Sequence, residues 1–419
     1  MKTIHQIFAN LMVAAVLLVM ITGCEFDNPA TAWDELNNRE NITPEITKVL
    51  PEDAGAVSEI TLIGKNFSTS AVDNWVYFDK TRCLIKSCTD TAIVVFRPNV
   101  VGDSVNIKVS VTNAWVVAKY AKPYKMDPVV ENFGIFTGDE ALIVGTVDRN
   151  DNIYMTMDDR SMIKILPDGS RDMSFNVETS GNLWTDIKIY NDQFYMTRTR
   201  RNVYRIPVAG GELEDWADFA DKEKVKYFDI NENGDLYGGG NKTGIVLLHQ
   251  DMNSVKVDDY FEDFNVNAVR IYSGYLYIAA NYAKFDSASI EVLEGIWKFP
   301  IQGDGSLGAR INVIDWTTTE YAASEILCMD ISADGILYLG TDNETSSPIL
   351  IFNEVLHNFT PMFYGLLTPP IEQIFWGNST YFYAVKNKRL PFESEDGTSP
   401  EGAFLKINTG VAGAPYYGR

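Results

Sequence analysis

A repeating pattern of apolar and polar positions fills the chain after Pro128. Each unit has an apolar run, a turn rich in Asn, Asp and Gly, and a second apolar run that carries a tyrosine. A third apolar run follows in every unit. The tyrosines are Tyr154, Tyr195, Tyr237, Tyr277, Tyr338 and Tyr383, at spacings of 41, 42, 40, 61 and 45 residues. A period near 40 residues is typical of four-stranded propeller blades. The pattern therefore predicts an all-β, six-bladed β-propeller over residues 127–419.

A different pattern covers residues 43–126. Short apolar runs, among them Ile60–Ile63 and Ala92–Phe96, are separated by turn residues. Alternating runs of this length predict half-buried strands of a small sandwich. The region also carries the spacing I-x-x-V-x-P followed by I-T-L-x-G-K-N-F. The residues of this motif are Ile46, Val49, Pro51, Ile60, Leu62, Gly64, Asn66 and Phe67.

These residues resemble an IPT/TIG domain, a small immunoglobulin-like sandwich. The resemblance implies a spacer or docking module, in which Trp75 and Trp115 would be packing aromatics. The D-x-x-G-x-L-Y hairpin of the later repeats resembles NHL-type propellers. In such a ring, we expect the segment "VVENFGIF" after Pro128 to pair with the last unit, which would cover two sheet edges.

The N-terminal end has an apolar run, Leu11–Ile21, that stops two small residues before Cys24. Eleven residues are too few to span a bilayer core of about 30 Å, so we interpret residues 1–23 as a signal peptide. The cysteine resembles the lipobox of bacterial lipoproteins, which implies acylation of Cys24 and a flexible tether over residues 24–42. The acids that follow resemble the export signal of surface lipoproteins in glycan-foraging Gram-negative bacteria. We therefore expect a lipid-anchored outer-membrane protein exposed at the cell surface.

Composition excludes several classes of function. A formal charge of −22 and a pI near 4.5 argue against a nucleic-acid partner, which requires a basic surface. Three histidines supply neither a zinc ligand set nor a Ser-His-Asp arrangement, so we expect no metal, no cofactor and no catalytic residue. The stretch Asp229–Asp235 resembles the start of a calcium loop, but Gly240 stands where the bidentate glutamate belongs, and a hairpin turn is preferred. Whether Cys83 and Cys88 pair stays open.

In a propeller, the loops between second and third strands and the loops leading into first strands gather at one end of the central channel. Here those loops combine cations with aromatic rings, which is unexpected on so acidic a chain. Aromatic faces beside hydrogen-bonding side chains suit a sugar polymer. The predicted ligand-binding residues are Trp184, Arg198, Arg200, Lys242, Asn281, Tyr282, Trp316, Tyr321 and Lys386.

The favoured hypothesis is a non-catalytic surface lipoprotein that binds a glycan or oligosaccharide. It would act as an accessory to polysaccharide uptake, beside an outer-membrane transporter and its lid lipoprotein. Two alternatives stay open: a propeller enzyme, either a lactonase or a polysaccharide lyase, and a protein-docking scaffold. Resemblance of fold does not decide among them.

Overall fold

The computed structural model describes residues 43–134, 136, 140–175, 177–181, 183–198, 200–284, 290–386 and 403–419. The predicted signal peptide, Cys24 and the tether lie outside these residues. Within the described ranges the chain forms strands and four 3-10 helices, with no α-helix, which confirms the all-β prediction. In this part of the chain, no helix has the length and apolar character needed to cross a bilayer. The 3-10 helices are η1 (Ala71–Asp73), η2 (Ala220–Lys222), η3 (Tyr260–Asp263) and η4 (Trp316–Thr318).

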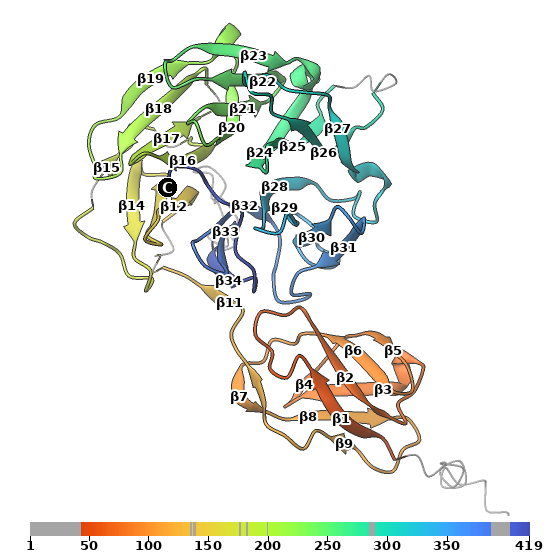
Figure 1. The fold of residues 1–419 in the computed structure, drawn as a ribbon. Helices are drawn as coiled ribbons and strands as arrows, with labels where there is room; N and C mark the ends of the chain where they lie inside the picture. The colour runs from red at the N-terminus through yellow and green to blue at the C-terminus, as the bar shows by residue number, and fades with distance from the viewer. Residues whose placement is uncertain are drawn as a thin grey trace, which may run out of the picture.

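The N-terminal domain consists of two four-stranded sheets and a two-stranded ribbon, and it stands apart from the larger body (Figure 1). The first sheet has the order β1 (Glu45–Leu50), β2 (Glu59–Lys65), β6 (Ala92–Phe96) and β5 (Ile85–Cys88). The second has the order β4 (Thr81–Arg82), β3 (Asn74–Phe78), β8 (Ile107–Val111) and β9 (Ala118–Lys119). The ribbon pairs β10 (Tyr124–Met126) with β7 (Gly102–Val105).

Alternation of side chains explains why this domain is a sandwich. In β2 the side chains of Ile60 and Leu62 are fully buried, while Thr61 between them is only partly buried. In β3, Val76 and Phe78 are buried in the same core. Because strand residues point to opposite faces in turn, each sheet presents one apolar face to the other.

Among its described residues, the larger body contains six four-stranded sheets, and the first five are formed by strands consecutive in sequence. Their bounds are β12 (Leu142–Val147), β13 (Ile153–Met157), β14 (Ser161–Ile165) and β15 (Val177–Glu178) in the first; β16 (Asp186–Tyr190), β17 (Gln193–Thr197), β18 (Asn202–Pro207) and β19 (Glu214–Asp218) in the second; β20 (Val225–Ile230), β21 (Leu236–Gly240), β22 (Thr243–Leu248) and β23 (Ser254–Asp258) in the third; β24 (Phe264–Tyr272), β25 (Tyr275–Tyr282), β26 (Glu294–Pro300) and β27 (Ile311–Asp315) in the fourth; and β28 (Ile326–Ile331), β29 (Leu337–Thr341), β30 (Ile349–Asn353) and β31 (Asn358–Pro361) in the fifth.

The sixth sheet joins the two ends of this body. Its order is β11 (Val130–Asn132), β34 (Ala403–Asn408), β33 (Tyr381–Lys386) and β32 (Ile371–Trp376). Strand β11 pairs antiparallel with β34 through Val130 and Ile407, Glu131 and Lys406, and Asn132 and Leu405. The pairing expected for the segment after Pro128 is therefore present.

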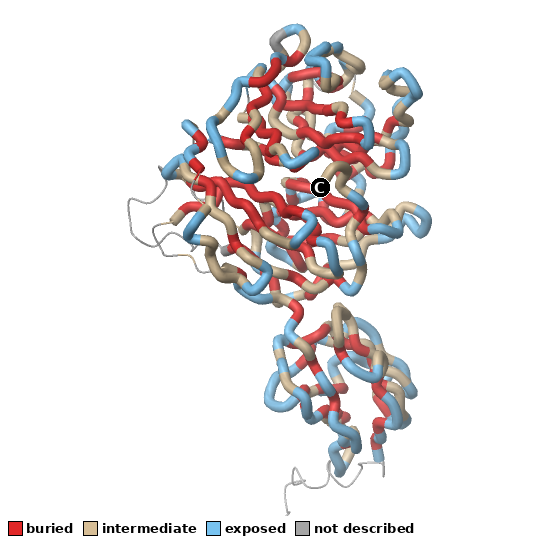
Figure 2. Tube along the Cα trace, turned by 60° about the vertical axis from the view of Figure 1, so that its left-hand side comes forward, coloured by how far each residue is buried: buried red, intermediate tan, exposed pale blue. Residues whose placement is uncertain are grey.

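The sheets are arranged in a propeller-like way around a common centre (Figure 1). The first strand of each sheet contacts the first strand of the next, and β32 of the sixth sheet contacts β12 of the first. Strands β12 and β13 are buried along their whole length, and Figure 2 shows further runs of buried residues, in red, through the larger body. Each sheet packs between two neighbours, so both faces of its inner strands are apolar and the alternation seen in the N-terminal domain is weak.

The repeated tyrosines have a common place in these sheets. All six lie on the second strand of their sheet and are buried. Several direct their hydroxyl groups to a polar partner: Tyr237 donates to the carbonyl oxygen of Gly305 at 2.8 Å, and Tyr195 donates to Gln250 Oε1 at 3.1 Å. The tyrosine pattern therefore reports packing between sheets.

Ring stacking and hydrogen bonds join the N-terminal domain to the larger body. The rings of Phe96 and Tyr364 stack with their centroids 4.6 Å apart. The backbone N–H of Phe363 donates to Ser58 Oγ at 3.2 Å. At the domain's end, the buried guanidinium of Arg97 donates to the carbonyl oxygens of Ala54 and Gly55 at 2.8 and 2.7 Å.

Two features of the N-terminal domain settle open or mistaken expectations. Cys83 and Cys88 do not form a disulfide. Burial raises the pKa of the Cys83 thiol to about 12, so this group stays protonated at neutral pH. Trp75 and Trp115, which the resemblance makes packing aromatics, are not core residues, because they are 37% and 62% exposed.

Candidate ligand-binding site

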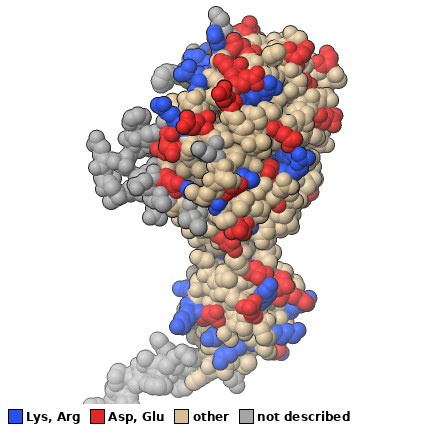
Figure 3. All heavy atoms as spheres, turned by 90° about the vertical axis from the view of Figure 1, so that its left-hand side faces the viewer, with Lys and Arg blue, Asp and Glu red and all other residues tan. Residues whose placement is uncertain are grey.

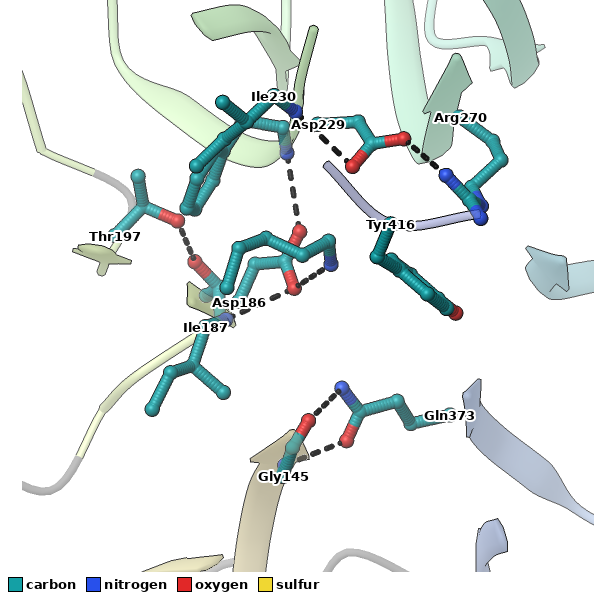
Figure 4. Close-up of polar contacts among 12 residues, drawn as sticks. Gly145, Asp186, Ile187, Thr197, Asp229, Ile230, Arg270, Gln373 and Tyr416 are labelled. Atoms are coloured by element: carbon teal, nitrogen blue, oxygen red, sulfur yellow. Dashed lines mark hydrogen bonds and ion pairs between the residues drawn. The ribbon is translucent and has the colours of Figure 1, made fainter. Parts of the chain in front are cut away.

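Polar side chains link the inner strands around the centre of the larger body (Figure 4). Asp186 Oδ2 on β16 accepts a hydrogen bond from the N–H of Phe228 on β20 at 3.1 Å. The side-chain amide of Gln373 on β32 forms two hydrogen bonds, of 2.8 and 3.0 Å, with the backbone of Gly145 on β12. These bonds hold strands from different sheets in register, so the ends of the strands carry side chains in fixed positions.

A buried ion cluster fills the centre near the hairpin turns. Arg270 on β24 is 2% exposed, and its Nη1 and Nε donate to Asp229 Oδ2 and Asp330 Oδ1, both at 2.7 Å. Burial alone would lower the pKa of Arg270, but the two carboxylates outweigh this effect and raise it. Arg270 is therefore a permanent cation that neutralises two buried acids.

The last residues of the chain cover this end of the centre. The carbonyl oxygens of Ala414 and Pro415 accept hydrogen bonds from Arg270 Nη2 at 3.0 and 3.2 Å. The ring of Tyr416 lies against Arg270, with 3.8 Å between the guanidinium carbon and the ring centroid (Figure 4). The guanidinium carbon of Arg419 also lies 3.8 Å from the ring centroid of Tyr416, and Arg419 donates to the carbonyl oxygen of Trp376 at 2.7 Å. A ligand cannot enter the centre here without displacing the chain's own tail.

At the opposite end, a cavity of about 350 Å³ opens among the ends of several inner strands. It is formed where β20, β24, β28 and β32 begin and where β21 and β25 end. This end holds the loops that the sequence assigns to ligand binding. The lining residues are Lys226, Tyr227, Asn241, Asn265, Asn267, Asn281, Glu325, Leu327 and Glu372.

Four asparagines give the cavity its chemical character. Asn267 Nδ2 donates to the carbonyl oxygen of Ile326 at 2.9 Å and contacts Asn281 Oδ1 at 3.3 Å. Asn241 and Asn265 form an isolated antiparallel bridge between the third and fourth sheets. Each amide offers two donors and one acceptor oxygen, so such a group can bond several hydroxyl groups at once. The cavity can therefore recognise a polyhydroxylated molecule.

Carboxylates make the surroundings of this cavity acidic. Glu294, which pairs with Asn281 across β25 and β26, is partly buried, and its Oε1 accepts a hydrogen bond from the N–H of Ile326 at 3.1 Å. Burial raises the pKa of Glu294 to about 7, and the charges of Glu325 and Asp342 contribute to the rise. Near neutral pH this carboxyl group therefore changes charge beside the asparagines.

Of the residues predicted from sequence to bind ligand, Asn281 lines the cavity. Lys242 and Arg200 are exposed, and Arg200 forms a bridge to Val225, one residue before the cavity-lining Lys226. Tyr282 packs its ring against Phe264, with centroids 5.3 Å apart. These positions are at or near the predicted end of the body, and a ligand role for them stays a prediction.

Two further predicted residues are engaged by the protein itself. Arg198 places its guanidinium 4.4 Å from the ring centroid of Tyr204 and donates to the Tyr204 hydroxyl at 2.7 Å. Lys386 donates from Nζ to Thr368 Oγ1. A ligand would have to compete with these contacts.

The three remaining aromatics are in the core, which corrects the sequence-based expectation. Trp184 is 2% exposed and donates from its indole N–H to the carbonyl oxygen of Gly181 at 2.7 Å. Trp316 is fully buried, donates to the carbonyl oxygen of Ser324 at 2.6 Å and lies nearly parallel to Tyr321, which is also buried. Large rings at strand ends fill the gaps between neighbouring sheets, so they are not available as sugar platforms in this structure.

Sequence reasoning missed most of the cavity lining because it followed loops with cations and aromatic rings. The overlooked residues lie on the first strands of their sheets or directly before them, not in the loops between second and third strands, and they are Lys226, Tyr227, Asn265, Asn267, Glu325, Leu327 and Glu372. One signal was present in the sequence. Asn265 and Asn267 lie two residues apart where the fourth unit begins, and residues two apart on a strand point to the same face, so the pair indicates a shared polar surface.

A second cavity, of about 420 Å³, lies at the hairpin end between the third and fourth sheets. It contains His249, whose Nδ1 is 2.8 Å from Asp235 Oδ1. No Ser, Thr or Cys is among its lining residues within the described part of the chain. The turn from Asn231 to Asp235 is closed internally, since Asn231 Oδ1 accepts from the N–H groups of Asn233 and Asp235, both at 2.9 Å, and Gly234 has φ +87°. This geometry supports a hairpin turn over a calcium loop.

No group of three or more His, Cys, Asp or Glu side chains suited to hold a metal ion occurs among the described residues.

Comparison with known proteins adds family information for the N-terminal domain and fold information for the rest. Residues 44–124 match the IPT/TIG domain model. No curated protein matches the chain in sequence. A luciferin-regenerating enzyme superposes with a TM-score of 0.51 at 13% identity, covering 69% of this chain and 99% of that one.

Two proteins of Bacteroides thetaiotaomicron VPI-5482 have lower scores. One is a structural genomics protein of unknown function, with a TM-score of 0.49, 12% identity and coverage of 88% of this chain and 98% of that chain. The other is an auxiliary nutrient binding protein, with a TM-score of 0.46, 10% identity and coverage of 90% of this chain and 99% of that chain. At identities this low, structural similarity indicates a similar fold and nothing about function. The chain thus has an N-terminal IPT/TIG domain followed by an all-β body that is similar to propeller-like proteins.

Proposed function

We propose that this protein is a non-catalytic, lipid-anchored surface protein whose larger body, a closed six-bladed propeller of NHL type, binds an oligosaccharide at one end of its central channel. The observation that carries the proposal is the cavity in which Asn241, Asn265, Asn267 and Asn281 converge from two adjacent sheets. Amides in such number bind hydroxyl groups without demanding a charged ligand. The cavity volume of about 350 Å³ falls within the usual range for small-ligand sites.

The charges around the cavity favour a neutral glycan. Its lining contains two acids, Glu325 and Glu372, and one cation, Lys226. A third acid, Glu294, lies beside Asn281. A polyanionic glycan would meet like charge at short range, whereas hydroxyl groups of a neutral sugar can donate to carboxylate oxygens. Tyr227 also lines the cavity, where the Lys226 ammonium lies 5.0 Å from the centroid of its ring, so a sugar ring would have to displace Lys226 to stack there.

The cellular setting of the proposal rests on the N-terminal sequence. Acyl chains on Cys24 would hold the protein at the outer membrane, because each buried methylene contributes about 0.8 kcal/mol. The tether and the IPT/TIG domain would then place the propeller away from the membrane. There it would serve polysaccharide uptake as an accessory to an outer-membrane transporter and its lid lipoprotein.

Affinity gel electrophoresis tests the binding proposal. The chain from Glu25 onward is run through gels that contain neutral or anionic polysaccharides, and retained ligands are confirmed by calorimetry. We expect retardation by at least one neutral glycan. Asn281→Ala should weaken binding about five- to tenfold, the value of one lost hydrogen bond of about 1–1.4 kcal/mol. Asn358→Ala, at an exposed position on the outer strand β31, should leave binding unchanged.

Two outcomes contradict the proposal. One is mobility that no glycan in the panel alters, and the other is equal loss of binding in both variants. Shortened glycan chains after incubation would instead indicate an enzyme. Anchoring has its own test: fatty acid supplied to cells should label the protein, and Cys24→Ser should abolish the label.

A further inference from the structure

The charges of the two domains differ in sign. Residues 43–126 contain ten Lys and Arg against eight Asp and Glu, whereas residues 127–419 contain 23 against 44. Figure 3 shows acidic groups over the upper body and several basic groups on the lower, N-terminal domain. The small domain is therefore close to neutral, and the placement of its cations decides whether it has a basic surface.

The basic residues form a row on the outer face of the second sheet of the N-terminal domain. Arg82 on β4 is opposite Tyr77 on β3, Tyr77 is opposite Lys108 on β8, and Lys108 is opposite Lys119 on β9. Directly opposed residues point to the same face of a sheet. Their neighbours Val76, Phe78 and Val109 are buried, so this row faces outward.

These cations are not neutralised within the described part of the protein. Arg82, Lys108 and Lys119 form no ion pair there. Asp79 lies near Lys108, but its carboxylate accepts hydrogen bonds from the backbone and side chain of Asn106 at 2.9 and 3.0 Å. The row therefore presents three cations that form no ion pair, although the charge of Asp79 lies near one of them, Lys108.

The opposite sheet of the same domain provides a contrast. Its exposed lysines are each paired with a glutamate: Lys48 with Glu52 at 3.9 Å, Lys65 with Glu45 at 2.7 Å and Lys86 with Glu59 at 2.6 Å. The two faces thus carry the same number of cations and differ in whether acids from the domain compensate them.

Exposed apolar side chains lie at one end of the row. Trp75 is on the same strand as Tyr77, two residues away, and is opposite Ser110 near the end of β8. The loop between β8 and β9 carries Trp115, Val116 and Val117, which are 62%, 47% and 47% exposed. Indole rings with aliphatic side chains beside Lys and Arg are the composition of segments that lie in a membrane interface.

We propose that this face, defined by Trp75, Tyr77, Arg82, Lys108, Lys119 and the Trp115–Val117 connection, binds an anionic lipid surface. The start of the described chain agrees with such a contact, because β1 packs against β9, the edge strand that carries Lys119. In the cell the contact rests on the proposed anchoring at Cys24. Residues 24–42 could span at most about 65 Å even if fully extended, so an anchored domain would stay within reach of the membrane.

Co-sedimentation with vesicles tests the proposal, using the unacylated chain from Glu25 onward, which contains every residue that the structure describes. Vesicles of 30% phosphatidylglycerol in phosphatidylcholine should bind the protein at low salt, and vesicles of phosphatidylcholine alone should not. Binding should weaken as salt rises, because screening reduces the attraction. The triple variant Arg82→Glu, Lys108→Glu and Lys119→Glu should need at least tenfold more lipid for half-maximal binding.

The matched control reverses the same number of charges on the other sheet, as Lys48→Glu, Lys65→Glu and Lys86→Glu. It should bind anionic vesicles far better than the first triple variant. Trp75→Ser should weaken binding with no change in net charge. Melting temperatures of all variants identify any that fail to fold.

Three results would overturn the proposal: no binding of the wild-type chain, equal loss in both triple variants, or equal binding to uncharged vesicles. If the first triple variant instead loses retardation in a gel of anionic polysaccharide while vesicles never bind, the face belongs to a glycan. The vesicle assay involves neither the acyl group nor the asparagine cavity, so its failure is distinct from failure of the proposed function.

Discussion

Replacing Arg270 with methionine should destabilise the larger body severely. The substitution keeps an unbranched, though shorter, side chain and removes the guanidinium that pairs with Asp229 and Asp330, each at 2.7 Å. Those acids are 2% and 1% exposed and cannot recover their hydration. The carbonyl oxygens of Ala414 and Pro415 lose their donor as well.

The expected loss of stability arises because two buried carboxylates, Asp229 and Asp330, are left without a partner charge. Removing one partner of a buried ion pair costs about 3–5 kcal/mol, because the remaining charge is left uncompensated. For a body of this size, each kcal/mol lowers the melting temperature by about 2–4 °C, so a decrease of roughly 6–20 °C is expected. An exposed pair provides the control: Arg149 and Asp192 are 2.9 Å apart with most of both side chains exposed, and Arg149→Met should cost less than about 1 kcal/mol.

Urea unfolding followed by tryptophan fluorescence and by far-UV circular dichroism measures the change. Because the chain has two domains, the transition of the larger body is identified by Trp297, Trp316 and Trp376, which are buried there. A second comparison isolates the charge effect. The variant with Arg270→Met, Asp229→Asn and Asp330→Asn should recover part of the loss, because neutral amides remove the unpaired charges.

The reasoning would be refuted if Arg270→Met unfolds within about 1 kcal/mol of the wild-type protein, or if the triple variant is less stable than the single one.

Three other predictions concern pH, ring closure and the corrected aromatics. The pKa of Glu294 near 7, above its ordinary value of 4.5, means that its stabilising contribution is complete below about pH 4.5 and is lost as the pH rises through 7. The melting temperature of Glu294→Gln relative to wild type should therefore increase between pH 5 and pH 8, and a constant difference would contradict this. Deleting residues 129–136 removes β11, so the melting temperature of the larger body should fall strongly; an unchanged value would show that the pairing with β34 is dispensable. Trp316→Ala should cost about 3–5 kcal/mol in urea unfolding yet leave the glycan Kd unchanged where the protein is folded, and a raised Kd at full stability would restore Trp316 as a contact residue.

The repeat pattern predicted the architecture well because packing between sheets leaves a strong trace in the sequence. A buried tyrosine on the second strand of each sheet must recur at the interval of one sheet, and the spacing of 40 to 45 residues is broken only once, at 61. The pairing of β11 with β34 was predictable because an open strand edge requires a partner and the leftover segment lies directly after Pro128.

The candidate site was less predictable, for two physical reasons. A tryptophan at a strand end looks the same in sequence whether it fills a gap between sheets, as Trp184 and Trp316 do, or faces a ligand. The asparagines of the cavity come together only because neighbouring sheets bring Asn241 and Asn265 side by side. In the N-terminal domain the same uncertainty had the opposite result, because Trp75 and Trp115 were expected to be packing aromatics and are exposed.

The composition of the sixth sheet has a consequence for biosynthesis. Asn132 in β11 pairs with Leu405 in β34, so the segment made first in the larger body waits for one of the last. At translation rates of about 5–20 residues per second, this delay is roughly 15–55 s. The N-terminal domain, whose last strand ends at Met126, has all its strands before that delay begins. The N-terminal domain can therefore complete its sheets before β34 becomes available to β11, and any quality control of the emerging chain must protect β11 until β34 arrives.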